Sequence, residues 1–297
     1  MQQIQEIKQK LSSTRDMHSV VKTMKSMAAV NIHHYEEAVT ALDEYSSTVS
    51  KALQIVISKL PELTRLPAFE HGGGTGCIIL GSKQGMVGQF NEHLAENVYK
   101  TLSSIMKGPL FHENLKIVTL GYKMESIIGQ HGLEVENNFA IEETIEDVTP
   151  LLNSLLDVVQ SWRFQENISS IIVFYNQEAG KAAFESETFY LYPLEEAALQ
   201  PLGFQEWDGP SIPQVFIEPE KAFRRLVQEY LFIMLYRAVM HSLASENAAR
   251  LRTMENAQQN IEDRLDELTD TYNQRRQLNI TSELLDIITG FEALKED

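Results

Sequence analysis

Glycine and proline are confined to the middle of this chain, and their distribution most constrains its fold. All nine prolines and fourteen of the fifteen glycines lie within residues 61–219. Residues 1–60 and 220–289 contain neither. Because proline costs a helix interior about 3 kcal/mol and glycine about 1 kcal/mol, two long breaker-free ends predict two long helices. Pro219 suits a first helical turn, and Gly290 predicts a cap or break near the end of the second helix.

The spacing of apolar residues supports two long helices. Alternating steps of three and four residues reach thirteen apolar side chains among seventeen positions from Ile4 to Leu60. The same stepping reaches twelve among fifteen positions from Phe223 to Tyr272. A repeat that averages 3.5 residues keeps its seam against a partner helix only if the helices supercoil. We therefore expect the two ends to pair as an antiparallel coiled coil; the alternative is two ordinary bundles whose breaks lack glycine and proline.

The middle segment alternates between strand and helix patterns. Short β-branched apolar runs predict buried strands of a parallel or mixed sheet, and one alternating run predicts an edge strand that Pro193 ends; these runs are 76–82, 115–121, 168–176 and 186–193. Helix-compatible spacing covers 89–107, 122–131 and 142–164. Strands and helices in alternation predict a Rossmann-like α/β layer domain. The expected fold is α/β plus long α, with an N-terminal coiled-coil helix at 1–60, a central α/β domain at 68–216 and a C-terminal coiled-coil helix at 219–297.

The charge of the chain excludes several classes of partner. There are 25 basic and 42 acidic side chains, and the net charge is −17. The two ends carry +1 and −3, so the middle segment, 61–220, carries −15. This balance argues against a nucleic-acid-binding surface and against anionic lipid, and an acidic middle is most often only a solvated surface. No apolar run approaches the roughly 18 residues of a membrane span, so no direct lipid anchor is expected.

The amino terminus and the single cysteine indicate the compartment. The first residues are polar and lack the apolar core of a secretory signal. Cys77 has no partner for a disulfide within the chain, and a lone cysteine suits a reducing environment. A cytoplasmic protein is therefore expected.

The sequence contains no recognisable catalytic motif. The glycine run at 71–76 is interpreted as a linker or turn, because it precedes its strand and lacks the lysine of a phosphate-binding loop. The loop at 81–91 follows a strand and opens a helix, so its amides could hold an anion, but a tight turn is favoured over a nucleotide site. His33 and His34 are adjacent, which makes a poor metal pair on a helix. His18 lies on the seam, where packing or hydrogen bonding is expected. No catalytic residue, metal site or cofactor is predicted.

Four sequence blocks resemble a known family. They are VVKTMKSMAA at 20–29, LASENAARLRTM at 243–254, YNQRRQLNITSELLDIITG at 272–290 and GMVGQFN at 85–91, in which Gly85, Gly88 and Asn91 match. Their order and spacing resemble the gamma subunit of F-type ATP synthases over nearly the whole chain. Asn31 stands where the family has a lysine, S-K-Q precedes Gly85 where S-D-R or S-D-K is usual, and the family is commonly basic. A main synthase and a divergent F-type ATPase both stay open, as do protons and sodium as the coupling ion.

The resemblance implies a rotor subunit without catalytic residues of its own. Its partners would be the alpha and beta subunits of the catalytic ring, the epsilon subunit and the membrane ring of c subunits, at the cytoplasmic face of a bacterial inner membrane. The matching positions imply contacts with the catalytic ring at Met24, Arg276, Gln277 and Thr281. Glu246 and Arg250 belong to a block that stabilises the coil and its surroundings.

Two other classes of protein remain as alternatives. One is an α/β binding module on a coiled-coil arm, which would tether partners without transmitting torque. The apolar carboxyl end, LLDIITGFEAL, favours a shaft inside a tight sleeve over such an arm. The other is a nucleotide-dependent enzyme that uses the loop at 81–91. The polar residues implied as ring contacts, Arg276 and Gln277, could instead be ordinary polar residues of a helix surface. Met24 could instead fill the seam of the coiled coil.

Overall fold

The computed structural model describes residues 2–59, 73–106, 114–141, 144–180, 182–193, 211 and 213–293. They group into two compact units. One, here called the body, spans 29–250, and the other, here called the outer coil, combines 1–28 with 251–297. These units cut the chain differently from the expected boundaries at 1–60, 68–216 and 219–297, which stay a prediction.

Both predicted long helices are continuous. Helix α1 runs from Gln2 to Lys59, and helix α6 from Pro219 to Ala293. The absence of breakers thus predicted their extent, and the alternative of two interrupted bundles is wrong. Pro219 is the first residue of α6, where its missing N–H costs no hydrogen bond. The described part of α6 reaches Ala293, so Gly290 lies near its end, as expected, but does not break the helix; a single glycine costs a helix only about 1 kcal/mol.

In the outer coil, α1 and α6 pair in antiparallel orientation. The predicted seam is confirmed there, since Leu11, Ala28, Met254 and Leu268 are all buried. His18 Nε2 lies 3.1 Å from Glu262 Oε1, and the Lys25 ammonium lies 3.3 Å from Glu255. The expectation that His18 is hydrogen-bonded on the seam is therefore confirmed.

The body is built on a five-stranded mixed sheet. Its order is β3-β2-β1-β4-β5, with only β5 antiparallel to its neighbour. The strands are β1 (Gly74–Leu80), β2 (Leu115–Leu120), β3 (Asn137–Phe139), β4 (Ile168–Ala179) and β5 (Ala182–Tyr192). The edge position of β5 agrees with the sequence pattern. Strand β3 was not predicted, because three residues with two asparagines carry no strand signal.

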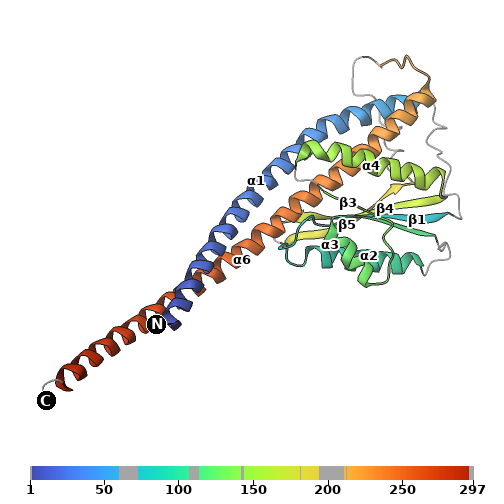
Figure 1. The fold of residues 1–297 in the computed structure, drawn as a ribbon. Helices are drawn as coiled ribbons and strands as arrows, with labels where there is room; N and C mark the ends of the chain where they lie inside the picture. Colours follow the sequence, from blue (N-terminus) through green and yellow to red (C-terminus); the bar gives the residue numbers. More distant parts are fainter. Residues whose placement is uncertain are drawn as a thin grey trace. The chain divides into compact units, whose positions relative to one another are not determined.

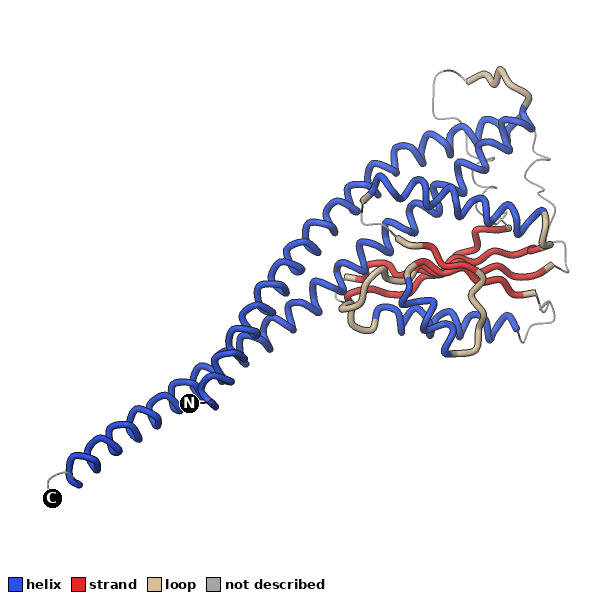
Figure 2. Tube along the Cα trace, viewed as in Figure 1, coloured by secondary structure: helices blue, strands red, loops and turns tan. Residues whose placement is uncertain are grey.

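Helices cover both faces of the sheet (Figures 1 and 2). Helices α2 (Phe90–Met106) and α3 (Tyr122–Gln130) lie on one face, and α4 (Ile145–Phe164) lies on the other with the body portions of α1 and α6. Along β1, Cys77 and Ile79 pack toward α2 and α3, whereas Ile78 and Leu80 pack into the core shared with α4, α1 and α6. The pleat of one strand therefore connects both cores.

The glycine run before β1 is only partly a linker. Strand β1 begins at Gly74, two residues before the predicted strand run at 76–82, so the interpretation of the whole glycine run as a linker or turn is wrong. A Cβ at Gly76 would lie 2.5 Å from the Trp162 ring, and one at Gly74 would collide with the Asn114 carbonyl oxygen. Glycine is used here because neighbouring atoms approach the strand too closely for a side chain. Residues 71 and 72 lie outside the described residues.

The antiparallel register of the outer coil can be tested by cross-linking. With His18→Cys and Glu262→Cys in one chain, a short bifunctional maleimide should link the two thiols within that chain, because the native side chains are in hydrogen-bonding contact. The matched control moves the second cysteine to Asp270, about 12 Å further along α6, and should give little product. Equal yields from both variants, scored by mass spectrometry of peptides, would contradict this register.

Candidate functional site

The family-like block at 243–254 lies mostly inside the body. Glu246 and Arg250 are one helical turn apart on α6 and form an ion pair of 2.5 Å, with side-chain exposures of 3% and 10%. The main-chain N–H groups of Lys83 and Gln84, in the loop after β1, also donate hydrogen bonds to the Glu246 carboxylate. This pair thus joins α6 to the loop that enters α2.

Two serines of α6 continue this connection. Ser242 Oγ donates a hydrogen bond of 3.1 Å to the carbonyl of Leu80, the last residue of β1. Ser245 Oγ donates one of 2.8 Å to the carbonyl of Asn176 in β4. Both serines are buried, and their role was missed by sequence reasoning, which used this block only as a family match. Small polar residues within a helix segment otherwise rich in buried apolar positions are the signal that could have found them.

The loop after β1 is held by Asn91, near the start of α2. Asn91 Oδ1 accepts a hydrogen bond of 2.9 Å from the Ser82 N–H, and its amide donates one of 2.8 Å to Ser82 Oγ. Ser82 Oγ in turn donates to the Gln84 carbonyl at 2.8 Å. The match of Asn91 to the family motif therefore has a structural meaning: it fixes the loop whose amides meet Glu246.

Burial dominates the electrostatics of this cluster. It raises the pKa of Glu246 above its usual value, while Arg250 and the amides of Lys83 and Gln84 act in the opposite direction. A carboxylate this deeply buried needs such donors, because an unpaired buried charge costs several kcal/mol. Burial in β1 also raises the pKa of the Cys77 thiol to about 12, so that thiol is a poor nucleophile.

The residues first considered as metal or nucleotide ligands serve local contacts. His33 and His34 are both exposed and both lie near Glu37, at 3.3 and 3.8 Å. Within the described ranges, no cluster of three or more histidine, cysteine or acidic side chains could hold a metal ion. The amides of the loop at 81–91 that could have met a phosphate meet Glu246 instead. The preferred interpretation of that loop as a tight turn fits this arrangement.

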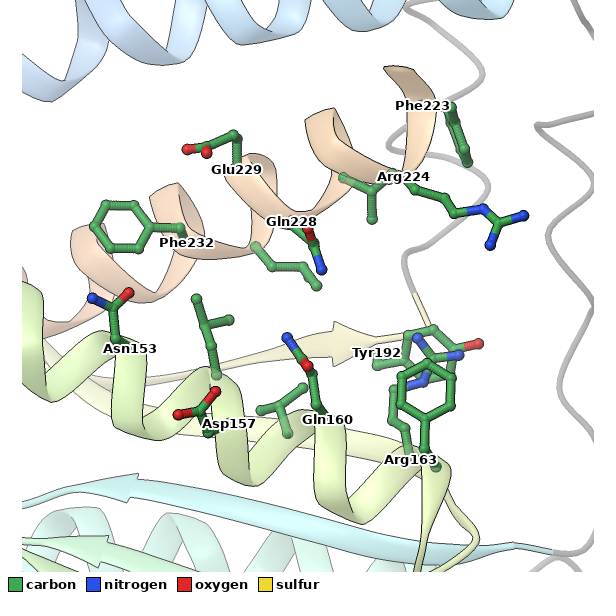
Figure 3. A pocket seen from close by; sticks show the side chains of 15 residues that line it. Asn153, Asp157, Gln160, Arg163, Tyr192, Phe223, Arg224, Gln228, Glu229 and Phe232 are labelled. Carbon is green, nitrogen blue, oxygen red and sulfur yellow. The ribbon is translucent and has the colours of Figure 1, made fainter. Parts of the chain in front are cut away.

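A groove of about 540 Å³ lies between α4 and the beginning of α6 (Figure 3). Asn153, Asp157 and Gln160 line it from α4, and Gln228 and Phe232 line it from α6. At one end, the guanidinium of Arg163 stacks 3.4 Å from the centre of the Tyr192 ring. The groove combines an apolar lining with charges of both signs, and a cation over an aromatic face is a packing contact rather than an acid–base pair.

The residues implied as ring contacts lie on the outer coil, at two places. Arg276, Gln277 and Thr281 are exposed on α6, and the Thr281 hydroxyl donates to the Gln277 carbonyl at 2.9 Å. Met24 on α1 is half-buried. Val20 and Met27, one helical turn to either side of it, are exposed. Lys25, the neighbour of Met24, pairs with Glu255, which lies about 30 Å before Arg276 along α6, so the two places are separate parts of one candidate surface.

Apolar side chains cluster on the last turns of α6. Counting outward from the His18–Glu262 pair by equal steps brings Gln2, the start of α1, opposite Leu278. Beyond that point no described residue of α1 lies opposite α6. This segment, here called the tip, exposes six large apolar side chains by 48 to 64%: Leu278, Ile280, Leu284, Leu285, Ile287 and Ile288. Exposed apolar patches of this kind mark surfaces that a partner covers.

No described helix is both long enough and apolar enough to cross a membrane.

Comparison with known proteins places this fold in a family. A family model described as "ATP synthase" matches residues 3–294. The ATP synthase gamma chain of Geotalea uraniireducens is 27% identical, over 99% of this chain and 100% of its own length. That of Christiangramia forsetii is 25% identical, over 99% of both chains. A rotor chain of the Euglena gracilis mitochondrial ATP synthase shares the fold, with a TM-score of 0.63, 16% identity, and coverage of 94% of this chain and 99% of that one.

These matches extend from one end of the chain to the other. The long paired helices and the five-stranded α/β domain are the fold of a central-stalk rotor subunit. The chain belongs to the ATP synthase family, and within it to the gamma chains.

The role of Asn91 can be tested by mutation. Asn91→Ala removes two hydrogen bonds and leaves the buried N–H of Ser82 without a partner. We expect the free energy of unfolding, measured with urea, to fall by about 1–3 kcal/mol. Asn114→Ala is the matched control, because that exposed amide makes one hydrogen bond at 3.2 Å and its loss should change stability by less than about 0.5 kcal/mol. Equal effects would contradict the role of Asn91.

Proposed function

We propose that this chain is the rotating shaft of an F-type ATP synthase or ATPase and couples transmembrane ion flow to ATP synthesis or hydrolysis in the beta subunits. The observation that carries the proposal is the tip, because α6 continues beyond the part of α1 that the structure describes and exposes apolar side chains there. A tethering arm has no need of such an end, whereas a shaft inside a close-fitting protein sleeve does. The tip therefore favours the rotor over the scaffold module.

The catalytic ring of alpha and beta subunits is the proposed sleeve. The tip would lie against the inner surface of this ring. Arg276 and Gln277, just before the tip, and Thr281, within it, would contact loops of the ring. On α1, Met24 would meet a beta subunit, together with the exposed Met17, Val20 and Met27 of the same stripe. Coupling requires that each beta conformation bind a different face of the shaft with different free energy. Unlike faces on α1 and α6 supply that asymmetry.

The other end of α6 is proposed to meet the membrane ring of c subunits. Phe216 and Ile217 lie just before α6 and are exposed by 90% and 55%. They border a hollow of about 370 Å³ lined by α1, by residues 213–217 and by α6. The epsilon subunit would bind the α/β domain. With partners on both sides, the chain would be peripheral, at the cytoplasmic face of a bacterial inner membrane.

The chain is proposed to contribute no catalytic residue of its own. Its best-defined ionisable cluster, Glu246 with Arg250, is buried and engaged by the protein itself, which leaves it no access to a substrate. ATP hydrolysis would then belong to the ring alone, and the isolated chain should show none. This separates the proposal from a nucleotide-dependent enzyme that uses the loop at 81–91.

Reconstitution tests the proposal. Added to the cognate alpha and beta subunits, the chain should give a stable complex that hydrolyses ATP. Arg276→Ala with Gln277→Ala should lower the ATP-driven torque or the yield of complex by about tenfold, because contacts with the ring are lost. The helical melting transition of the isolated variant should stay unchanged, since both side chains are exposed.

Gln259→Ala with Arg264→Ala is the matched control. Both residues lie on α6 of the outer coil and make only exposed contacts within their own helix. This variant should assemble and turn over like the unmodified chain. A ring that assembles and hydrolyses ATP equally well without the chain would contradict the proposed function.

A further inference from the structure

The α/β domain has a crevice of the kind that binds ligands in related architectures. In open parallel sheets, ligands bind beyond the carboxyl ends of the strands, where successive connections change from one face of the sheet to the other. Here α2 and α3 cover one face and α4 the other, so the change falls between β1 and β4 (Figure 1). The loop after Leu80 and the segment around Asn176 flank this point.

Helix α6 fills this crevice, and three of its side chains make polar contacts there. Ser242 bonds to the end of β1, and Ser245 bonds to β4 on the other side. Glu246 accepts the N–H groups of Lys83 and Gln84, in the loop between β1 and α2. Every element that would surround a ligand is therefore contacted by one face of α6.

Glu246 occupies the place of an anionic ligand. Main-chain N–H groups that precede a helix form concave anion sites, and the partial positive charge of the helix N-terminus adds to their attraction. Here Asn91 holds such a loop in shape, and α2 begins at Phe90. Arg250 completes the surroundings of the carboxylate, and its buried Nε has no hydrogen-bond partner among the described residues.

We infer that Glu246 is an internal anion ligand, which closes the ligand crevice of the α/β domain and locks α6 to it. The apolar contacts between α6 and the sheet are extensive, but the hydrophobic effect behind them is non-directional. Hydrogen bonds to β1, β4 and the loop are directional and fix both movements. The lock would keep domain and shaft turning as one, a consequence that rests on the proposed function.

Hydrogen exchange on the full-length isolated chain tests the lock. In Glu246→Ala, the amides of Lys83 and Gln84 lose their acceptor and should exchange about tenfold faster. The amides of Ile78 and Val173, inside the sheet, should keep their rates. Acetate supplies a free carboxylate and should slow the two loop amides again in this variant, with no effect on the unmodified chain.

Two further variants complete the test. Glu267→Ala removes an exposed carboxylate of α6 that pairs only with Arg264, and should change neither the loop amides nor their response to acetate. Glu246→Gln keeps the shape of the side chain and one acceptor oxygen, so this variant should fold. Its Lys83 and Gln84 amides should exchange faster than in the unmodified chain but more slowly than in Glu246→Ala.

Three outcomes would overturn the inference. Loop amides that exchange at unmodified rates in both Glu246 variants would show that the carboxylate does not hold the loop. A uniform rise across the sheet amides would show that Glu246 contributes only to global stability. Exchange in Glu246→Ala that acetate leaves unchanged would show that the loop is not an anion site. These outcomes concern the isolated chain, so none of them bears on whether the chain is a rotor.

Discussion

The burial of α6 within the body is the constraint on which the rest of the structure depends. Every residue from Leu231 to Arg250 is buried or half-buried, because the sheet, α1 and the loop after β1 all contact this stretch. A helix buried in this way has no solvent-facing stripe on which polar residues could be placed freely. Each buried polar group on it therefore needs a hydrogen-bond partner within the protein. Small residues such as Ala244 and Ala249 allow close approach, and Ser242, Ser245 and Glu246 have their partners in the α/β domain.

The same helix leaves the body and continues without a break to Ala293. Its seam with α1 uses residues at steps of three and four, whereas its last turns expose apolar side chains and have no described residue of α1 opposite them. One helix thus serves as part of a core, as half of a coiled coil and as a free apolar end. This combination suits a shaft, since torque applied at one end of a continuous helix need not pass through a loop.

Much of this fold could be predicted from the sequence, for physical reasons that the structure makes plain. The lack of glycine and proline in the ends and their 3,4 spacing predicted α1 and α6, because long helices tolerate few breakers and a seam needs that repeat. The β-branched runs predicted the long strands. Strand β3 was not predicted because it pairs through only three residues, and Gly74 was misinterpreted because close packing, not a turn, requires glycine there.

The candidate site was less accessible to sequence reasoning. The resemblance singled out Glu246 and Arg250, but their partners, the amides of Lys83 and Gln84, belong to the main chain and leave no trace in residue types. The contacts of Ser242 and Ser245 likewise depend on how the sheet packs on α6. For Met24, Arg276, Gln277 and Thr281 the proposed partner is another chain, so their roles stay predictions.

Observing rotation of the α/β domain would test the central claim most directly. Tyr122→Cys places a thiol at an exposed position on α3, whereas the buried Cys77, with its pKa raised to about 12, should not react with a label. A bead attached at position 122, with the catalytic ring fixed to a surface, should turn continuously in one direction when ATP is supplied and stop when it is removed. A bead that stays still while the same complexes hydrolyse ATP would contradict the account.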